Sequence, residues 1–140
     1  MPLIDWDDSL SVGYRPMDAE HMRLVELVNE LHDNLLAGRS MTLIEAGFHR
    51  VARHATDHFR HEENLMAESD YPDGHDHILA HRQLEAQIAD LITRIDAGEP
   101  VFTLELVEFL KNWLLNHILT MDKKLGAHLA LPSPTTSGLR

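Results

Sequence analysis

The stretch HFRHEENLMAESDYPDGHDHILAH (His58–His81) decides the predicted fold, because it contains the end of one helical pattern, a turn at Tyr71-Pro72 and the start of the next pattern. It is also unusually rich in imidazole and carboxylate side chains, with histidine at positions 58, 61, 75, 77 and 81. The chain has no cysteine, which excludes thiolate zinc sites and iron–sulfur clusters. His, Asp and Glu are the remaining ligands for a transition metal. Metal binding is therefore the first hypothesis.

Apolar residues at helical spacing continue on both sides of this stretch and predict four helices. Their expected ranges are 17–38, 42–69, about 74–98, and 103 to about 125. Asp18 and Thr103 are the expected N-caps of the first and last helices, and Thr42 with Glu45 has the spacing of a capping box for the second. The expected C-terminal stops are Gly38, Gly98 and Pro100.

The short connections between these helices leave sequential neighbours little choice but to run antiparallel. The predicted fold is therefore all-α, an up-down-up-down antiparallel four-helix bundle with an extended N-terminal arm. We expect one four-helix domain over residues 1–130, with the arm at about 1–17, and a flexible C-terminal tail at 131–140. Trp6 of the arm is expected to pack against the bundle.

Charge limits the classes of partner. The 140 residues include 12 basic and 23 acidic side chains, for a formal net charge of -11. Such a field repels nucleic acid and anionic membrane surfaces, so neither is expected as a partner. The first residues, MPLIDWDDSLSVGY, show neither a basic leader nor an apolar span, and the expected location is the cytoplasm.

A single pair of histidines is weak evidence for a metal site. With 11 histidines in 140 residues, about 0.9 pairs at the i,i+4 spacing of one helix face arise by chance. Two such pairs occur, His54/His58 and His77/His81. Any one of these histidines, taken alone, is most simply a surface residue.

Topology gives a stronger argument. In an antiparallel bundle the starts of the first and third helices and the ends of the second and fourth lie at one end of the molecule. Inward-facing polar groups there would be costly unless they were paired or bound to metal. Seven such side chains from four helices fall in this layer: His21, His58, Glu62, His77, His81, His117 and Asp122.

Seven ligands exceed the needs of one tetrahedral zinc ion and suit two octahedral ions with shared bridges, for which iron is the expected metal. His58 and Glu62 are four residues apart, as are His77 and His81, so each pair shares a helix face. His117 and Asp122 are five apart, which is about 140° of rotation in a regular α-helix. We therefore predict either a π-type widening near residues 117–122 or a bridge that approaches from the side.

The chain resembles the hemerythrin family, and within it the single-domain bacterial hemerythrins. VGYRPMDAEHMRLVELVNELHD is similar to the N-terminal block of the family. HFRHEENLM and YPDGHDHILAH are similar to its HxxxE and HxxxH blocks, and WLLNHILTMDKKL to its HxxxxD block. The similarity covers nearly the whole chain.

The resemblance implies two iron ions bridged by Glu62, Asp122 and an oxo or hydroxo group. One iron would be held by His77, His81 and His117, and the other by His21 and His58. It also implies that dioxygen binds reversibly at the iron with only two histidines. The implied role is oxygen storage, transport or delivery, with an oxygen-using protein as the class of partner that would receive it.

The donor set favours an oxygen carrier over an enzyme, because five neutral imidazoles and only two carboxylates donate less charge than carboxylate-rich diiron sites. An apolar pocket is expected beside the metals, since water promotes loss of bound oxygen. Leu24, Phe59, Trp113 and Ile118 are the candidates for its lining, and ordinary core packing would bury the same residues.

Two other functional classes stay open. One is a diiron enzyme that acts on peroxide, nitric oxide or ferrous iron, and the other is an oxygen-sensing module. His54 is the chief rival ligand, one turn farther from the layer than His58. His61 and Glu63 point away from the ligand face of their helix, which favours a solvated role or a supporting role outside the ligand set.

Overall fold

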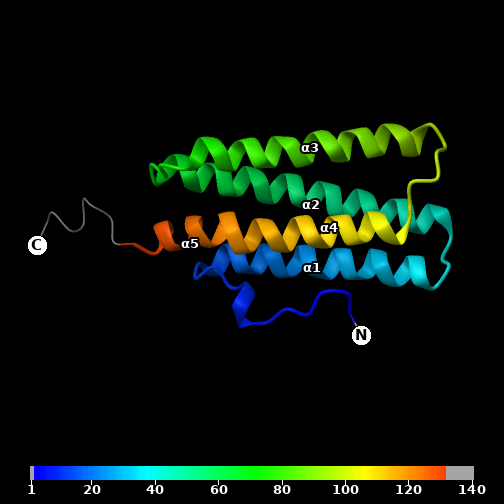
Figure 1. The fold of residues 1–140 in the computed structure, drawn as a ribbon, viewed down its shortest axis with the longest axis horizontal. Coiled ribbons are helices and arrows are strands. Elements are labelled where there is room, and N and C mark those ends of the chain that lie inside the picture. The colour runs from blue at the N-terminus through cyan, green and yellow to red at the C-terminus, as the bar shows by residue number, and fades with distance from the viewer. Residues whose placement is uncertain (1, 132–140) are drawn as a thin grey trace, which may run out of the picture.

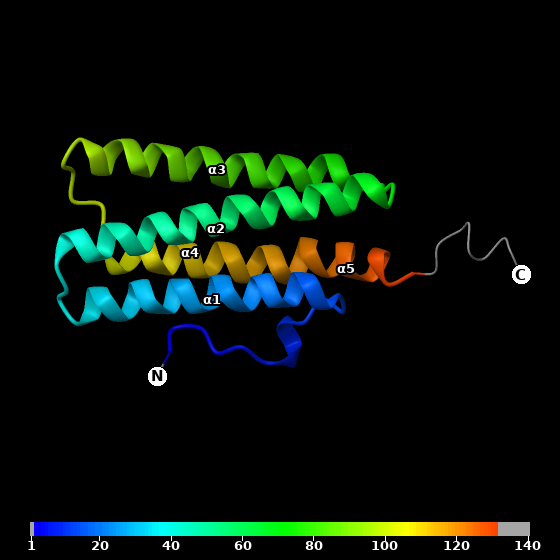
Figure 2. The ribbon, with the colours of Figure 1, turned by 180° about the vertical axis from the view of Figure 1, so that it is seen from behind.

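The computed structural model describes residues 2–131, and those residues form a four-helix bundle (Figure 1). The order of elements is η1 (Asp8–Leu10), α1 (Arg15–Leu36), α2 (Met41–Glu68), α3 (Gly74–Asp96), α4 (Leu104–His117), η2 (Ile118–Asp122) and α5 (Lys123–Leu129). Helices α4, η2 and α5 follow one another as the fourth rod of the bundle (Figures 1 and 2). The predicted fold class is confirmed. The expected tail covers residues 131–140, and its residues 132–140 lie outside the described part.

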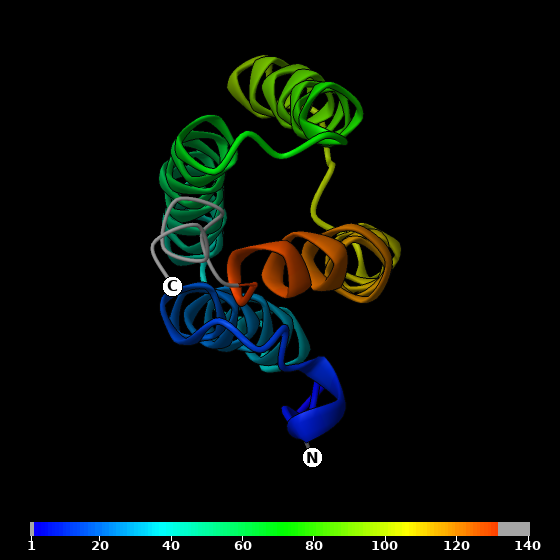
Figure 3. The same ribbon diagram turned by 90° about the vertical axis from the view of Figure 1, so that its left-hand side faces the viewer.

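Helix α1 packs against α2 and α4, and α2 packs against α3. Viewed along the bundle, the four rods stand at the corners of a square (Figure 3). The start of α1, the end of α2, the start of α3 and the end of the fourth rod lie at the same end of the molecule (Figure 1). This is the layer in which the sequence places the candidate ligands.

Two expected helix caps are replaced by neighbouring residues. The N-cap of α2 is Ser40, whose side chain accepts a hydrogen bond from the Leu43 backbone N–H, and not Thr42, because the helix already begins at Met41. Helix α1 begins at Arg15, with Pro16 in its first turn, so Asp18 lies inside the helix and is not its N-cap. Thr103 caps α4 as predicted, with its side chain accepting from the Leu106 N–H.

The N-terminal arm ends at Tyr14, three residues before the predicted boundary, and it lies along α1 (Figures 1 and 2). Instead of capping the helix, Asp18 holds the arm: its carboxylate accepts hydrogen bonds from the Ser11 hydroxyl and the Val12 N–H. Farther back, the Asn29 side chain makes two hydrogen bonds with the backbone of Ile4. Trp6 is partly buried against the core, as expected.

The predicted fourth helix is not one regular α-helix. Residues Ile118–Asp122 form a π-helix, in which the turn is widened, and α5 continues after it. The π-type alternative of the prediction is therefore confirmed. Among residues 2–131, no helix combines the length and apolar character needed to cross a membrane.

Candidate metal centre

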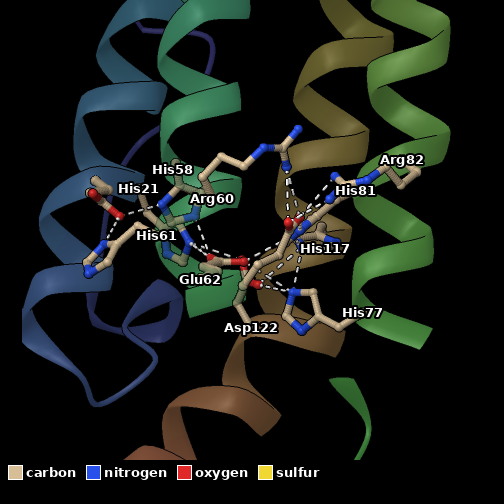
Figure 4. A network of polar contacts seen from close by, with 12 residues as sticks. His21, His58, Arg60, His61, Glu62, His77, His81, Arg82, His117 and Asp122 are labelled. Atoms are coloured by element: carbon tan, nitrogen blue, oxygen red, sulfur yellow. Dashed lines mark hydrogen bonds and ion pairs between the residues drawn. The ribbon is translucent and has the colours of Figure 1, made fainter. Parts of the chain in front are cut away.

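Each of the four rods contributes to one buried polar cluster at the same end of the bundle (Figure 4). The fourth rod supplies His117 from the end of α4 and Asp122 from the end of η2. The other three rods supply His21 from α1, His58 and Glu62 from α2, and His77 and His81 from α3. All seven side chains are at most 4 % exposed. The structure thus brings together all seven of the side chains selected from the sequence. His54, the rival candidate, does not belong to the cluster.

The cluster has two halves that share their carboxylates. Ligand-type atoms of three histidines gather with Glu62 and Asp122 in one half, and those of His21 and His58 gather with the same two carboxylates in the other. Within each half these atoms all lie within 4.8 Å of one another. Histidines of the first half are His77, His81 and His117.

Both carboxylates divide their oxygen atoms between the halves. Glu62 Oε1 lies 3.0 Å from His81 Nε2, while Glu62 Oε2 lies 2.5 Å from His58 Nε2. Asp122 Oδ1 lies 3.1 Å from His117 Nε2, and Asp122 Oδ2 lies 3.0 Å from His21 Nε2. One oxygen toward each half is the arrangement of a carboxylate that can bridge two cations.

Several atoms in this cluster lack the partners that buried polar atoms normally have. Within residues 2–131, both Asp122 oxygens and His58 Nε2 are buried and make no hydrogen bond, although His21 Nε2 lies close to Asp122 and Glu62 Oε2 lies close to His58 Nε2. His117 Nε2 also lies 3.1 Å from His77 Nε2 and 3.2 Å from His81 Nε2. A neutral imidazole nitrogen that carries no proton is an acceptor, so three converging Nε2 atoms repel one another unless protons or cations lie between them. The donor set fits metal ions.

In the metal-free protein, protons take the place of that positive charge. Burial alone would lower the pKa of His58, but its hydrogen bond to Glu20 and the adjacent Glu62 carboxylate raise it to about 10. Burial likewise opposes the charged form of His77, and Asp122 with Glu62 raises its pKa to about 9. Burial would raise the pKa of both carboxylates, yet the surrounding imidazoles hold the pKa of Glu62 and Asp122 below the ordinary range.

Aromatic rings of the apolar core stack on two of the imidazoles. Phe59 stacks on His81 with ring centroids 4.1 Å apart, and Trp113 stacks on His117 at 4.5 Å. A cavity of about 30 Å³ reaches His117, and Leu24, Phe59 and Trp113 are among its lining residues. Ile118, the fourth candidate for a pocket, is fully buried but does not line this cavity.

Two further carboxylates touch the cluster from outside. Glu63 Oε2 lies 3.0 Å from His81 Nδ1, which agrees with the supporting role considered for Glu63. Glu20 Oε1 accepts hydrogen bonds from His58 and His61. Sequence reasoning missed Glu20, because its partners are on another helix and no spacing within α1 reveals them.

Comparison with known proteins places these observations in a family. Residues 12–129 match the model of the hemerythrin HHE cation binding domain. A bacteriohemerythrin of Stenotrophomonas maltophilia is 34% identical over 135 residues, which cover 92% of this chain and 86% of the relative. A bacteriohemerythrin of Methylococcus capsulatus is 30% identical, covering 93% of this chain and 99% of that protein.

The fold gives the same result. The crystal structure of a wild-type hemerythrin superposes with a TM-score of 0.86 at 28% identity and covers 92% of this chain and 99% of that one. A family model that spans most of the chain, relatives of nearly full length and the same bundle agree. The chain belongs to the hemerythrin family.

Proposed function

We propose that the cluster holds two iron ions and that the protein binds dioxygen reversibly, as a store, carrier or supplier of oxygen and not as an enzyme. The observation that carries this proposal is the division of Glu62 and Asp122 between two groups of histidines. Two shared carboxylates favour a pair of metal ions over a single ion. Family membership supports iron as the metal.

The proposed ligand assignment follows the two halves of the cluster. His77, His81 and His117 would hold one iron, His21 and His58 the other, and Glu62, Asp122 and an oxo or hydroxo group would bridge them. When bound, the iron pair supplies the electrons that reversible dioxygen binding needs. The half with two histidines offers one imidazole fewer, which supports it as the side where dioxygen enters.

The residues around the cluster serve this function by excluding water. Phe59 and Trp113 cover the faces of two imidazoles, and the adjacent cavity has an apolar lining. An apolar, closed environment limits the access of water and protons, which would convert a reversible binder into one that releases reduced oxygen. The proposed oxygen-pocket role of Leu24, Phe59 and Trp113 rests on this argument. Ile118 does not line the cavity, and its proposed role rests only on its complete burial next to His117 in the chain.

The test is to measure iron content and the visible spectrum of the reduced protein under argon, after oxygen is added, and again under argon. We expect about two irons per chain and an absorption band that appears with oxygen and disappears when oxygen is removed. H58A should lose one iron and the band. H54A is the matched control, because His54 lies on the same helix outside the cluster, and it should keep both.

Immediate conversion of the two-iron protein to a stable oxidised form would contradict reversible binding and favour the enzymatic alternative. Failure of the wild-type chain to take up iron would overturn the ligand assignment itself. Equal loss of iron in H58A and H54A would show that the assignment of His58 is wrong.

A further inference from the structure

Two of the five clustered histidines have a carboxylate on the outer nitrogen of the ring. His58 Nδ1 lies 2.7 Å from Glu20 Oε1, and His81 Nδ1 lies 3.0 Å from Glu63 Oε2. The Nδ1 atoms of His21 and His77 are buried and have no hydrogen-bond partner in the described part of the chain. One carboxylate-supported imidazole therefore belongs to each half of the cluster.

The two supporting carboxylates differ in their own partners. Glu20 is shared between His58 and His61, and His61 is 37% exposed. Glu63 is held by two guanidinium groups: Arg82 contacts both of its oxygens at 2.6 and 3.1 Å, and Arg60 contacts it at 3.1 Å. Among residues 2–131, arginine side chains therefore neutralise Glu63 but not Glu20.

This arrangement is part of a network that joins α2 to α3. Arg60 and Arg82 hold Glu63, and both arginines also form ion pairs with Glu85. Figure 4 shows the two arginines beside His81. Burial opposes ionisation of Glu63, but its hydrogen bonds to Arg82 and His81 lower its pKa, so it stays a carboxylate. Glu85 thus contacts the same two arginines as Glu63, whereas the contact with His81 is made by Glu63.

We propose that Glu63 is a positioning residue for His81: it accepts the Nδ1–H hydrogen bond and so presents the unprotonated Nε2 to the cluster, while Arg60 and Arg82 fix the carboxylate in place. The proposal rests on the proposed function only in taking His81 as a metal ligand. By offsetting the charge of Glu63, the arginines also leave His81 a weaker electron donor to a metal ion than His58. The support of His58 comes from Glu20, which has no guanidinium partner among residues 2–131.

The physical reason lies in the two nitrogens of imidazole. A neutral ring carries one proton, and the hydrogen bond of one nitrogen determines whether the other is free to bind a cation. Stacking on Phe59 fixes the plane of the His81 ring, with an interplanar angle of 11°, but does not choose its tautomer. The hydrogen bond to Glu63 selects the tautomer of His81 that carries its proton on Nδ1.

Zinc is a suitable probe, because it binds N/O ligands, carries no redox chemistry and leaves the protein visible to NMR. The measurements are zinc affinity, by competition with a chromophoric chelator, and the His81 Hδ1 resonance of the zinc-loaded protein. The variants are E63L, which removes the acceptor, and E63Q, which keeps an acceptor oxygen without the charge. E85Q is the matched control, because it disturbs both arginines and leaves the His81 contact.

In the wild type and E85Q we expect a protected His81 Hδ1 signal and zinc affinities within about twofold of each other. In E63L the signal should be lost to exchange with water and zinc affinity should fall by about 10- to 100-fold. E63Q should restore the signal, shifted upfield, and most of the affinity. A purely structural role of Glu63 would not be rescued in this way.

An unchanged Hδ1 signal and affinity in E63L would overturn the proposal. A loss of zinc affinity in E85Q as large as that in E63L would also overturn it. Such a result would mean that the ion-pair network matters because it holds α2 and α3 together, and not because Glu63 positions His81. Absence of zinc uptake by the wild type would remove His81 as a ligand and the proposal with it. Zinc results as expected, together with an iron form that does not bind oxygen reversibly, would contradict only the proposed function.

Discussion

His117 Nε2 and Asp122 Oδ1 lie 3.1 Å apart, although the two residues are five positions apart in the chain. In a regular α-helix that separation would turn Asp122 about 140° away from His117. The π-helix at Ile118–Asp122 removes the difference, because a widened turn brings residues five apart onto one face. One irregular turn thus allows a single rod to supply candidate ligand atoms to both halves of the cluster.

The first prediction concerns this turn. Deleting Thr120, which is exposed and whose hydroxyl donates a hydrogen bond to the Asn116 carbonyl, should convert the π turn into a regular α turn with His117 and Asp122 four apart. A spacing of four again shares one face, so we expect the variant to fold and to take up about two zinc ions per chain. Circular dichroism and zinc titration are the measurements.

The control is deletion of Asn112, an exposed residue in the regular part of α4. It should rotate every later residue of the rod by about 100° relative to the earlier ones and abolish zinc uptake. If both deletions abolish zinc uptake equally, the idea that the π turn is an α-helical turn with one inserted residue is wrong.

Phe59 is the subject of the second prediction. It is 2% exposed and stacks on His81, so F59A should lower the free energy of unfolding of the metal-free protein by about 3 to 5 kcal/mol. The enlarged cavity should also admit water and shorten the lifetime of the oxygenated iron form. Urea unfolding and the decay of the visible band measure the two effects.

F109A is the comparison for F59A, since Phe109 is 36% exposed and lies about two helical turns before His117 in α4. Its effect on the free energy of unfolding should be about 1 kcal/mol or less, with an unchanged lifetime of the oxygenated form. Equal lifetimes for F59A and the wild type would show that Phe59 does not exclude water from the site.

Gly126 makes a close contact between α5 and the N-terminal arm. A Cβ atom at this position would lie 2.1 Å from the Val12 carbonyl oxygen, so G126A must displace the arm or the helix. We expect faster amide exchange at Val12 and faster proteolysis of the arm. G47A is the control: its Cβ would make ordinary contacts of 3.7 and 3.8 Å, and the variant should gain up to about 1 kcal/mol from helix propensity. Unchanged exchange at Val12 in G126A would contradict the close contact.

The last prediction concerns pH. The pKa values of His58 and His77 are raised to about 10 and about 9 in the folded metal-free protein, above the ordinary value of 6.5. A raised pKa stabilises the folded state fully below about pH 6.5, and this contribution is lost as the pH rises toward 9 and 10. The free energy of unfolding of the metal-free protein should therefore fall between pH 7 and pH 10, as measured by urea unfolding.

Metal binding at pH 7 should release these protons, because a metal ligand is an unprotonated imidazole. Calorimetry of zinc binding in two buffers with different ionisation enthalpies counts the protons. H77A should release fewer than the wild type, and H54A should release the same number. Binding enthalpies that do not depend on the buffer would rule out protonated histidines in the metal-free cluster.

The sequence was sufficient for the fold and for the assembly of the cluster, because apolar spacing sets the helices and short connections set their directions. It was weaker where neighbouring residues compete for one role. Ser40 and Thr42 are both good N-caps, and only the start of α2 decides between them. Asp18 looks like a cap from its position, whereas its carboxylate binds the folded-back arm at Ser11 and Val12.

Contacts between helices were the other gap. Glu20 and Glu63 each meet a histidine of another helix, at 2.7 and 3.0 Å, and such pairings depend on how two rods are rotated against each other. The π turn could be predicted as one of two alternatives, because His117 and Asp122 had either to share a face or to approach one site from different sides. A functional constraint thus revealed an irregular backbone that local propensity does not indicate.

The origin of the cluster in four separate rods also has a consequence for protein quality control. A chain interrupted before His117 would contain the first five clustered residues but neither of the last two. Ligands that bind only the folded protein stabilise it, so the interrupted chain would gain little from added metal. Added metal would then stabilise complete chains but not fragments that end before His117.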